Sequence, residues 1–225
     1  MNKFKFIIPA YNCQNFLNKC LDSIEIQDYP KELIEATVID DCSEFPLCTK
    51  QYSFSINLQR NKKRMYPAFN RFQIYSNSND DDIIIFLDGD DWLADNLVLS
   101  ILNKIYRKNK IHWTISNHKL FFNSKLKVKP CFVGKSISGK PKICHLRTGY
   151  GYVWNKMPIK WIKKDNENIK WMSDWNENLW ALKNYSNPYK INSSLCVYNL
   201  DTSKTRKENK DYHEMIEYFD GKMLN

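Results

Sequence analysis

The chain has 225 residues, a formal net charge of +9 at pH 7 and a pI near 9.1, and 43% of its residues are hydrophobic. This composition excludes an intrinsically disordered chain, and no apolar run is long enough to cross a bilayer as a helix. Because the N-terminus also lacks a signal-peptide pattern, we expect one globular domain, or one domain with a lobe, and no transmembrane segment.

Short apolar segments alternate with segments of helical periodicity along the first half of the chain. Asn12 is a candidate N-cap for the first helix, Pro67 is expected in the first turn of the second, and Asp95 is expected to cap the third, which carries Leu97 to Ile105. The expected strands are residues 3–9, 34–39, 54–58 and 83–87, and the first two expected helices are residues 14–27 and 65–77. This alternation predicts an α/β fold with a single Rossmann-like, mostly parallel sheet and helices on both faces.

The second half is less regular, and we find neither an internal repeat nor a shift in composition that would separate independent domains. Its expected elements are two strands within 111–133, a loop at 135–142, a helix at 174–185, a strand at 189–198 and a charged peripheral helix at 203–225.

The net charge bears on which partners the chain could bind, and the cysteine content bears on the compartment in which it is found. The positive charge suits an anionic partner such as a nucleotide-sugar, nucleic acid or an anionic membrane surface, although a composition rich in Lys, Asn and Ile produces it without any binding role. The seven cysteines are odd in number and contain no Cys-x-x-Cys pair, and the four histidines show no metal-ligand spacing. We therefore expect reduced thiols in a cytoplasmic protein.

Polar clusters follow three of the expected strands. They are Pro9-Ala10-Tyr11-Asn12, Asp40-Asp41 and Asp88-Gly89-Asp90. Because ligands of open parallel sheets bind at the carboxyl ends of the strands, we expect these clusters to converge on one site.

The strongest chemical signal is the buried strand that ends in Asp88-Gly89-Asp90-Asp91. Carboxylates this close raise one another's pKa unless a positive group lies between them. Oxygen ligands suit Mg²⁺ or Mn²⁺, and Mg²⁺ commonly binds one or two carboxylates plus substrate phosphates. We interpret Asp88 and Asp90 as metal ligands, Gly89 as a residue that lets the backbone approach a ligand, and Asp91 as a supporting residue. An acidic turn that caps the next helix is the alternative.

These motifs, taken in order, carry a family resemblance. The chain resembles GT-A family 2 glycosyltransferases, closely over the first half and more loosely over the second. In the second half, Arg147-Thr148 with Trp154-Asn155-Lys156 looks like a region of small viral and bacterial members, and Ser173-Asp174 looks like the late acidic motif of the family.

The resemblance implies a GT-A fold with a smaller mixed lobe on the acceptor side. Residues 1–110 would form the nucleotide-sugar-binding half, 111–200 the acceptor-side half of the same domain, and 201–225 a charged helical tail. It also implies metal-dependent, inverting transfer of a hexose from a nucleotide-diphospho-sugar, with a UDP-sugar favoured by analogy, to a hydroxyl acceptor.

The same resemblance assigns the donor site. The nucleotide would be lined by Pro9, Ala10, Tyr11 and Asn12, with Tyr11 against the base or ribose. Asp88 would face the ribose as well as the metal. A carboxylate of Asp40 or Asp41 would accept the uracil N–H or a ribose hydroxyl. Phe69 stands where the family more often has Arg, so Arg64, or else Arg71, becomes the candidate for the diphosphate.

For the general base of the transfer, Asp174 matches best and Glu177 is the runner-up, while a plain first-turn acid is the alternative. The tryptophans that could form an acceptor platform are Trp154, Trp171, Trp175 and Trp180, with core packing the alternative for at least two of them. His145 and Arg147 are candidate contacts for the donor diphosphate or for an acceptor phosphate, and a surface hydrogen-bonding pair is the alternative.

The acceptor stays open between a glycan, a protein, a lipid-linked sugar and a hydroxylated base in DNA, as in viral DNA-modifying glycosyltransferases, whose location would be the host cytoplasm. A degenerate, non-catalytic nucleotide-sugar-binding module is the non-enzymatic alternative. A nucleotidyltransferase is disfavoured, because no Gly-rich phosphate loop follows the first strand.

Overall fold

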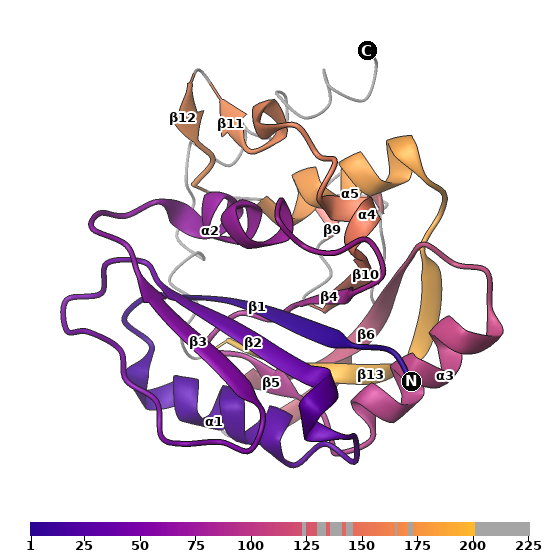
Figure 1. Ribbon diagram of the computed structural model, residues 1–225, viewed down its shortest axis with the longest axis horizontal. Helices are drawn as coiled ribbons and strands as arrows, with labels where there is room; N and C mark the ends of the chain where they lie inside the picture. The colour runs from indigo at the N-terminus through magenta and orange to yellow at the C-terminus, as the bar shows by residue number, and fades with distance from the viewer. Residues whose placement is uncertain are drawn as a thin grey trace.

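A curled mixed sheet runs through the computed structural model, which describes residues 1–122, 125–129, 134–135, 141–142, 146–164, 166–170 and 173–200 (Figure 1). Within these residues the sheet has nine strands in the order β3-β2-β1-β4-β10-β6-β13-β5, with β7 paired to β6. Its helices lie on both faces, as the sequence predicts.

The first half of the chain supplies four parallel strands. They are β1 (Phe4–Ala10), β2 (Ile34–Asp40), β3 (Ser55–Arg60) and β4 (Ile83–Phe86). Three of them are almost wholly buried, whereas the edge strand β3 is mostly exposed. This difference explains why the inner strands read as continuous apolar runs.

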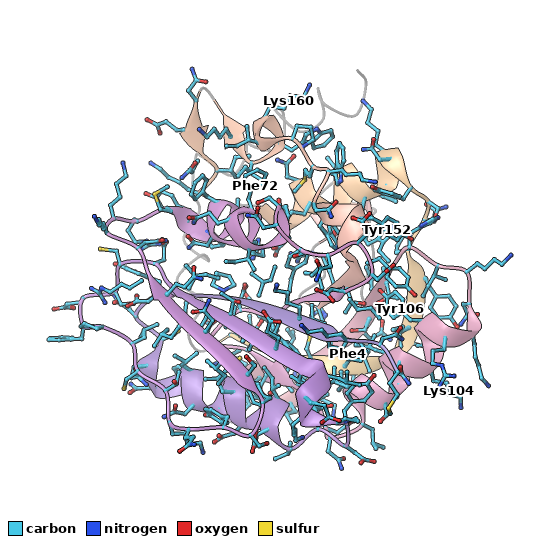
Figure 2. All side chains as sticks on the ribbon, viewed as in Figure 1. Phe4, Phe72, Lys104, Tyr106, Tyr152 and Lys160 are labelled. Atoms are coloured by element: carbon cyan, nitrogen blue, oxygen red, sulfur yellow. The ribbon has the colours of Figure 1, made fainter. Side chains whose placement is uncertain are left out.

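Successive side chains of β1 enter different layers, because neighbouring residues of a strand point to opposite faces. Phe6 and Ile8 belong to one hydrophobic cluster, with residues of α1 (Gln14–Glu25) and α3 (Val98–Lys108), and Ile7 belongs to a second. Phe4 and Tyr106, labelled in Figure 2, are members of the first cluster.

The second layer consists of α2 (Tyr66–Tyr75), α4 (Gly151–Trp154) and α5 (Ser173–Asn184). In Figure 1 these helices lie above the sheet, and α1 and α3 lie below it. Phe86 of β4 packs edge-on against Tyr75 of α2 and Trp154 of α4, with ring centroids 5.9 and 5.0 Å apart.

The second half of the chain completes the same sheet. Strand β10 (Arg147–Tyr150) lies antiparallel between β4 and β6 (Trp113–Phe122), and β13 (Tyr189–Asn199) lies parallel to β6. The remaining elements are β5 (Trp92–Leu93), β7 (Lys125–Lys129), β8 (Gly134–Lys135), β9 (Pro141–Lys142), β11 (Lys163–Lys164), β12 (Glu167–Asn168) and the 3₁₀ turns η1 (Lys31–Leu33) and η2 (Ile159–Trp161).

Several local expectations need correction. Asn12 does not cap α1, because its side-chain oxygen accepts the backbone N–H of Glu44 instead. The helix after Asp95 begins at Val98, and the Asp95 carboxylate accepts the N–H of Leu97 just before it. The short strands β8 and β9 lie within or beside the expected loop 135–142, and β5 was not expected.

The first turn of α2 contains Pro67, as expected. The expected helix at 203–225 lies outside the described residues. Among the helices that are described, none combines the length and apolar character of a membrane span.

Candidate active site

The polar clusters at the ends of β1, β2 and β4 meet at one edge of the sheet, as the sequence predicts. Ala10 pairs with Asp40 in the parallel ladder, and the N–H of Asp41 donates to the carbonyl of Ala10 at 2.8 Å. On the other side of β1, the N–H of Gly89 donates to the carbonyl of Pro9 at 3.0 Å. Backbone contacts of β1 therefore bring the three clusters together.

Asp40 is buried and anchors the loop that follows β2. Its carboxylate accepts the backbone N–H groups of Ser43 and Leu47, at 2.8 and 3.2 Å, and a guanidinium nitrogen of Arg60 at 2.5 Å. Burial by itself raises the pKa of Asp40, but the hydrogen bonds from Ser43, Leu47 and Arg60 lower it below its ordinary value. Asp40 thus fixes the shape of the loop that follows β2.

Asp41 is also buried and holds the approach to α2. Its carboxylate accepts hydrogen bonds from Asn61 Nδ2, Arg64 Nε and the backbone N–H groups of Met65 and Tyr66, all between 2.7 and 3.0 Å. The backbone of Tyr66 has a φ of 67°, which is costly for a residue with a bulky side chain. The Asp41 carboxylate therefore fixes a strained turn beside the site.

Tyr11 and Arg64 form a stack on the exposed side of these loops. The guanidinium carbon of Arg64 lies 3.4 Å from the centre of the Tyr11 ring and 5.2 Å from that of Tyr66. Tyr11 is 41% exposed, so this cation–π pair is open to solvent. Asn12, with a φ of 49°, turns the chain after Tyr11, and its N–H donates to Ser43 Oγ.

Gly89 is needed for packing within the chain. A Cβ atom at this position would lie 2.9 Å from Ala10 Cβ and 3.1 Å from Cys13 Sγ. The sequence led us to expect a close approach to a ligand, whereas the close approach that the structure shows is to Ala10 and Cys13. Gly89 therefore allows the aspartate segment, residues 88–91, to pack closely against the end of β1 and the loop that follows it.

The three carboxylates of the segment have different surroundings. The Asp88 side chain is 39% exposed, and its Oδ1 accepts a hydrogen bond from Arg71 Nη1 at 3.3 Å. Desolvation, only partly offset by Arg71, raises the pKa of Asp88 to about 7. Asp91 is buried, and its Oδ1 accepts the N–H of Asn199 at 2.9 Å, which fits a supporting role at the end of β13. Burial and then the charges of Asp90 and Asp88 raise the pKa of Asp91.

Asp88 and Asp90 offer oxygen atoms of the kind that Mg²⁺ and Mn²⁺ accept. Among the described residues, no cluster of three or more His, Cys, Asp or Glu side chains could hold a metal ion alone. Mg²⁺ and Mn²⁺ accept oxygen ligands, and Mg²⁺ is often held by one or two carboxylates with substrate phosphates and water. Asp88 and Asp90 would supply the protein share of such a site.

A cluster of four buried or mostly buried charges lies behind Asp88. Arg71 of α2 and Arg147 of β10 are each 1% exposed. Arg71 donates to Glu177 Oε1 at 3.0 Å and to Asp174 Oδ1 at 2.8 Å. Arg147 contacts the same two acids, with its Nη2 atom 2.8 Å from Glu177 Oε2 and 3.0 Å from Asp174 Oδ1. Burial by itself lowers the pKa of Arg71, but Glu177, Asp174 and Asp88 raise it, so this guanidinium stays charged.

The cluster distinguishes the two candidate bases. Glu177 is completely buried and hydrogen-bonded to both arginines, so the runner-up cannot reach an acceptor. Asp174 keeps 17% of its side-chain surface exposed, at the first turn of α5. Asp174 therefore remains the candidate base. Arg147, a candidate phosphate contact from the sequence, is buried among these carboxylates instead.

Two of the candidate acceptor tryptophans have packing roles. Trp154 is fully buried between Phe86 and Trp113. Trp180 donates its indole N–H to the carbonyl of Val153 and packs against Trp161 at 5.6 Å. The expected roles of His145 and Trp171, and of the Trp175 side chain, lie outside the described residues.

Comparison with known sequences finds related proteins. A model of Glycosyl transferase family 2 matches residues 5–132. Staphylococcus aureus poly(ribitol-phosphate) beta-N-acetylglucosaminyltransferase TarS is 29% identical over 106 residues, 41% of this chain and 17% of that protein. Streptococcus pneumoniae glycosyltransferase GlyA is 29% identical over 119 residues, 46% of this chain and 15% of that protein. The chain thus spans less than a fifth of the length of these two curated relatives.

Solved structures share the fold. The crystal structure of S. aureus TarS in complex with UDP-GlcNAc superposes with a TM-score of 0.75 at 16% identity, over 99% of this chain and 67% of that chain. The mannosyltransferase PcManGT from Pyrobaculum calidifontis, in complex with GDP-Man and Mn²⁺, gives a TM-score of 0.56 at 14% identity, over 95% and 59% of the two chains. At identities this low, the likeness establishes the fold alone.

Proposed function

Because the chain belongs to glycosyl transferase family 2 and has a GT-A fold, we propose that it is a metal-dependent, inverting hexosyltransferase that uses a nucleotide-diphospho-sugar. The observation that carries the proposal is the guanidinium of Arg71, which contacts Asp88 at 3.3 Å and Asp174 at 2.8 Å. A transfer reaction needs, within one site, a group that stabilises the charge of the leaving diphosphate and a base that accepts the proton of the acceptor hydroxyl. Arg71 joins the carboxylates proposed for these two tasks.

We place the nucleotide against Tyr11 and Arg64. The Tyr11 ring offers a partly exposed face, and the Arg64 guanidinium, held by Asp41, offers positive charge beside it. A UDP-sugar is the favoured donor because TarS was solved with UDP-GlcNAc. A GDP-sugar is the competing donor, since PcManGT was solved with GDP-Man.

Asp88 and Asp90 would hold Mg²⁺ or Mn²⁺, which when bound supplies positive charge to the diphosphate leaving group. Arg71 contacts Asp88, and the hydrogen bond from the Asn199 N–H fixes Asp91, the residue after Asp90. The chain's own contribution to such a metal site would be the carboxylates of Asp88 and Asp90.

Asp174 would act as the general base. It accepts the proton of the acceptor hydroxyl while that oxygen attacks the anomeric carbon. The bond between this carbon and the diphosphate oxygen breaks as the new bond forms on the opposite face, which inverts the configuration. Arg71 and Arg147 both contact Asp174 through its Oδ1 atom, which fixes the position of the proposed base.

For the acceptor, the net charge of +9 favours a molecule that carries phosphate or other negative charge. The relative TarS is named for transfer to poly(ribitol-phosphate). A phosphate-linked glycan is therefore our first choice, and DNA with hydroxylated bases is the second.

The test begins with thermal shift measurements against UDP and GDP, each with and without Mn²⁺, followed by assays of donor hydrolysis and of transfer to candidate acceptors by mass spectrometry. We expect a Mn²⁺-dependent shift with one nucleotide, and turnover that Asp174→Asn abolishes while nucleotide binding persists. The variant Glu35→Gln, on the far end of β2, is the matched control. Absence of both Mn²⁺-dependent binding and turnover in the wild type would refute the proposal.

A further inference from the structure

Four charged side chains form a closed ring that includes the proposed base, Asp174, and that contacts Asp88. Arg71 contacts Glu177 at 3.0 Å and Asp174 at 2.8 Å, and Arg147 contacts the same two acids at 2.8 and 3.0 Å. Positive and negative groups alternate around the ring. The four residues come from α2, β10 and α5, so the ring joins elements that are distant in the sequence.

Glu177 occupies the inner position of this ring. It is 0% exposed, and each of its carboxylate oxygens accepts a hydrogen bond from a different arginine. Burial raises the pKa of Glu177, and the charges of Arg71 and Arg147 oppose this rise. A group so enclosed cannot touch a donor or an acceptor, so any effect on the reaction must pass through the arginines.

The planar guanidinium of Arg71 provides the route. Its Nε donates to Glu177, its Nη1 to Asp88 and its Nη2 to Asp174. Because the nitrogens of a guanidinium have a fixed mutual geometry, a carboxylate that anchors Nε also sets the directions of Nη1 and Nη2. The position of Glu177 therefore determines where Arg71 holds the other two carboxylates.

We propose that Glu177 is a positioning residue that sets the relative placement of Asp88 and Asp174 by anchoring Arg71 and Arg147. The inference rests on the proposed function, because it assigns Asp88 to the donor and Asp174 to the acceptor. Glu177 would thus contribute to the reaction without touching either the donor or the acceptor. Small misplacements of reacting groups cost up to about a hundredfold in rate, so the spacing of the two carboxylates bears directly on turnover.

The experiment compares wild type with Glu177→Gln, which keeps the shape of the side chain but removes its charge and one acceptor oxygen. Donor hydrolysis gives kcat and KM, and calorimetry gives the Kd for UDP with Mn²⁺. We expect kcat to fall by about tenfold to a hundredfold, while KM for the donor and the Kd for UDP change by less than about threefold. Glu35→Gln, the same chemical change at a partly exposed ion pair on β2, should keep wild-type values.

A second variant covers the case in which Glu177→Gln does not fold. The double variant Glu177→Gln with Arg147→Gln removes one buried charge of each sign and leaves Arg71 paired with Asp174. It should fold and show the same loss in kcat. A folded variant of either kind with wild-type kcat would overturn the positioning role, as would a loss confined to UDP binding. An inactive wild type would instead refute the proposed function, so the two failures can be told apart.

Discussion

Replacement of Gly89 by alanine tests whether the aspartate segment depends on its contact with the loop after β1. The new methyl carbon would lie 2.9 Å from Ala10 Cβ and 3.1 Å from Cys13 Sγ, well inside the usual carbon contact distance of about 3.5–4.0 Å. Overpacking of this kind typically costs about 1–3 kcal/mol, so we expect a loss of about 2 kcal/mol in the free energy of unfolding. The corresponding fall in Tm is about 4–8 °C for a chain of this size.

Urea denaturation of four proteins measures this effect: wild type, Gly89→Ala, Ala10→Gly and the double variant. Removing the Ala10 methyl group removes the nearest clashing atom, so the double variant should be at least about 1 kcal/mol more stable than the sum of the two single effects predicts. The Ala10→Gly variant alone is the matched control. Additivity within about 0.5 kcal/mol would refute the steric account of Gly89.

Two further predictions concern the loops around the site, and a third concerns the start of α4. The pKa of Asp40 is lower in the folded chain than its value of about 3.9 in the unfolded chain. The ionised carboxylate therefore stabilises the fold at pH values above about 3.9. This stabilisation is lost as the pH falls through the pKa of Asp40 in the folded chain. Asp40→Asn should therefore lower the free energy of unfolding by about 2 kcal/mol at pH 7, and should make that free energy less dependent on pH in the acid range. An unchanged pH dependence in the acid range would contradict this expectation. Arg64→Met should weaken UDP binding by about tenfold in calorimetry, whereas Lys63→Met, at the neighbouring exposed position, should leave it unchanged. Equal effects of the two substitutions would argue against a contact between Arg64 and the nucleotide. Gly151→Ala would place a Cβ 1.9 Å from the backbone oxygen of Asn79, so we expect a loss of about 3 kcal/mol or more, and a variant with wild-type Tm would contradict the packing described here.

The parallel half of the sheet could be predicted because its signals are local. Burial of β1, β2 and β4 on both faces leaves continuous apolar runs in the sequence, and the helices between them carry apolar residues at helical spacing. The convergence of the three polar clusters follows from parallel pairing alone. Strand β5 escaped prediction because two residues give no periodic pattern, and Trp92-Leu93 becomes a strand by pairing with β13 more than 100 residues away.

The candidate site was predictable only in part. Asp88, Asp90 and Asp174 have motif neighbours that single them out, although the roles assigned to them remain proposals. The burial of Glu177 and its contacts with Arg71 and Arg147 could not be read from the sequence, since Arg71 and Glu177 are 106 residues apart. The one local signal was the spacing of Asp174 and Glu177, three residues apart on α5, which places both carboxylates on one face of the helix.

The turn of Asn12 illustrates a different limit. A polar residue just before a helix usually caps it, but the positive φ of Asn12 points its side chain to the loop after β2, where it accepts the N–H of Glu44. The partner lies 32 residues away, so no local rule identifies it. Loops that bind one another across the end of a sheet can overrule capping preferences in this way.

The hydrogen bond between Asp91 and the N–H of Asn199 has a consequence for how the protein is made. It joins the aspartate segment to the end of β13 across 108 residues, and β5 pairs with the same strand. During synthesis on the ribosome, the first four strands emerge long before this partner exists. Contacts of such high sequence separation form slowly, because a long loop must close before they add any stability. Asp91 therefore cannot make this hydrogen bond until residue 199 has left the ribosome.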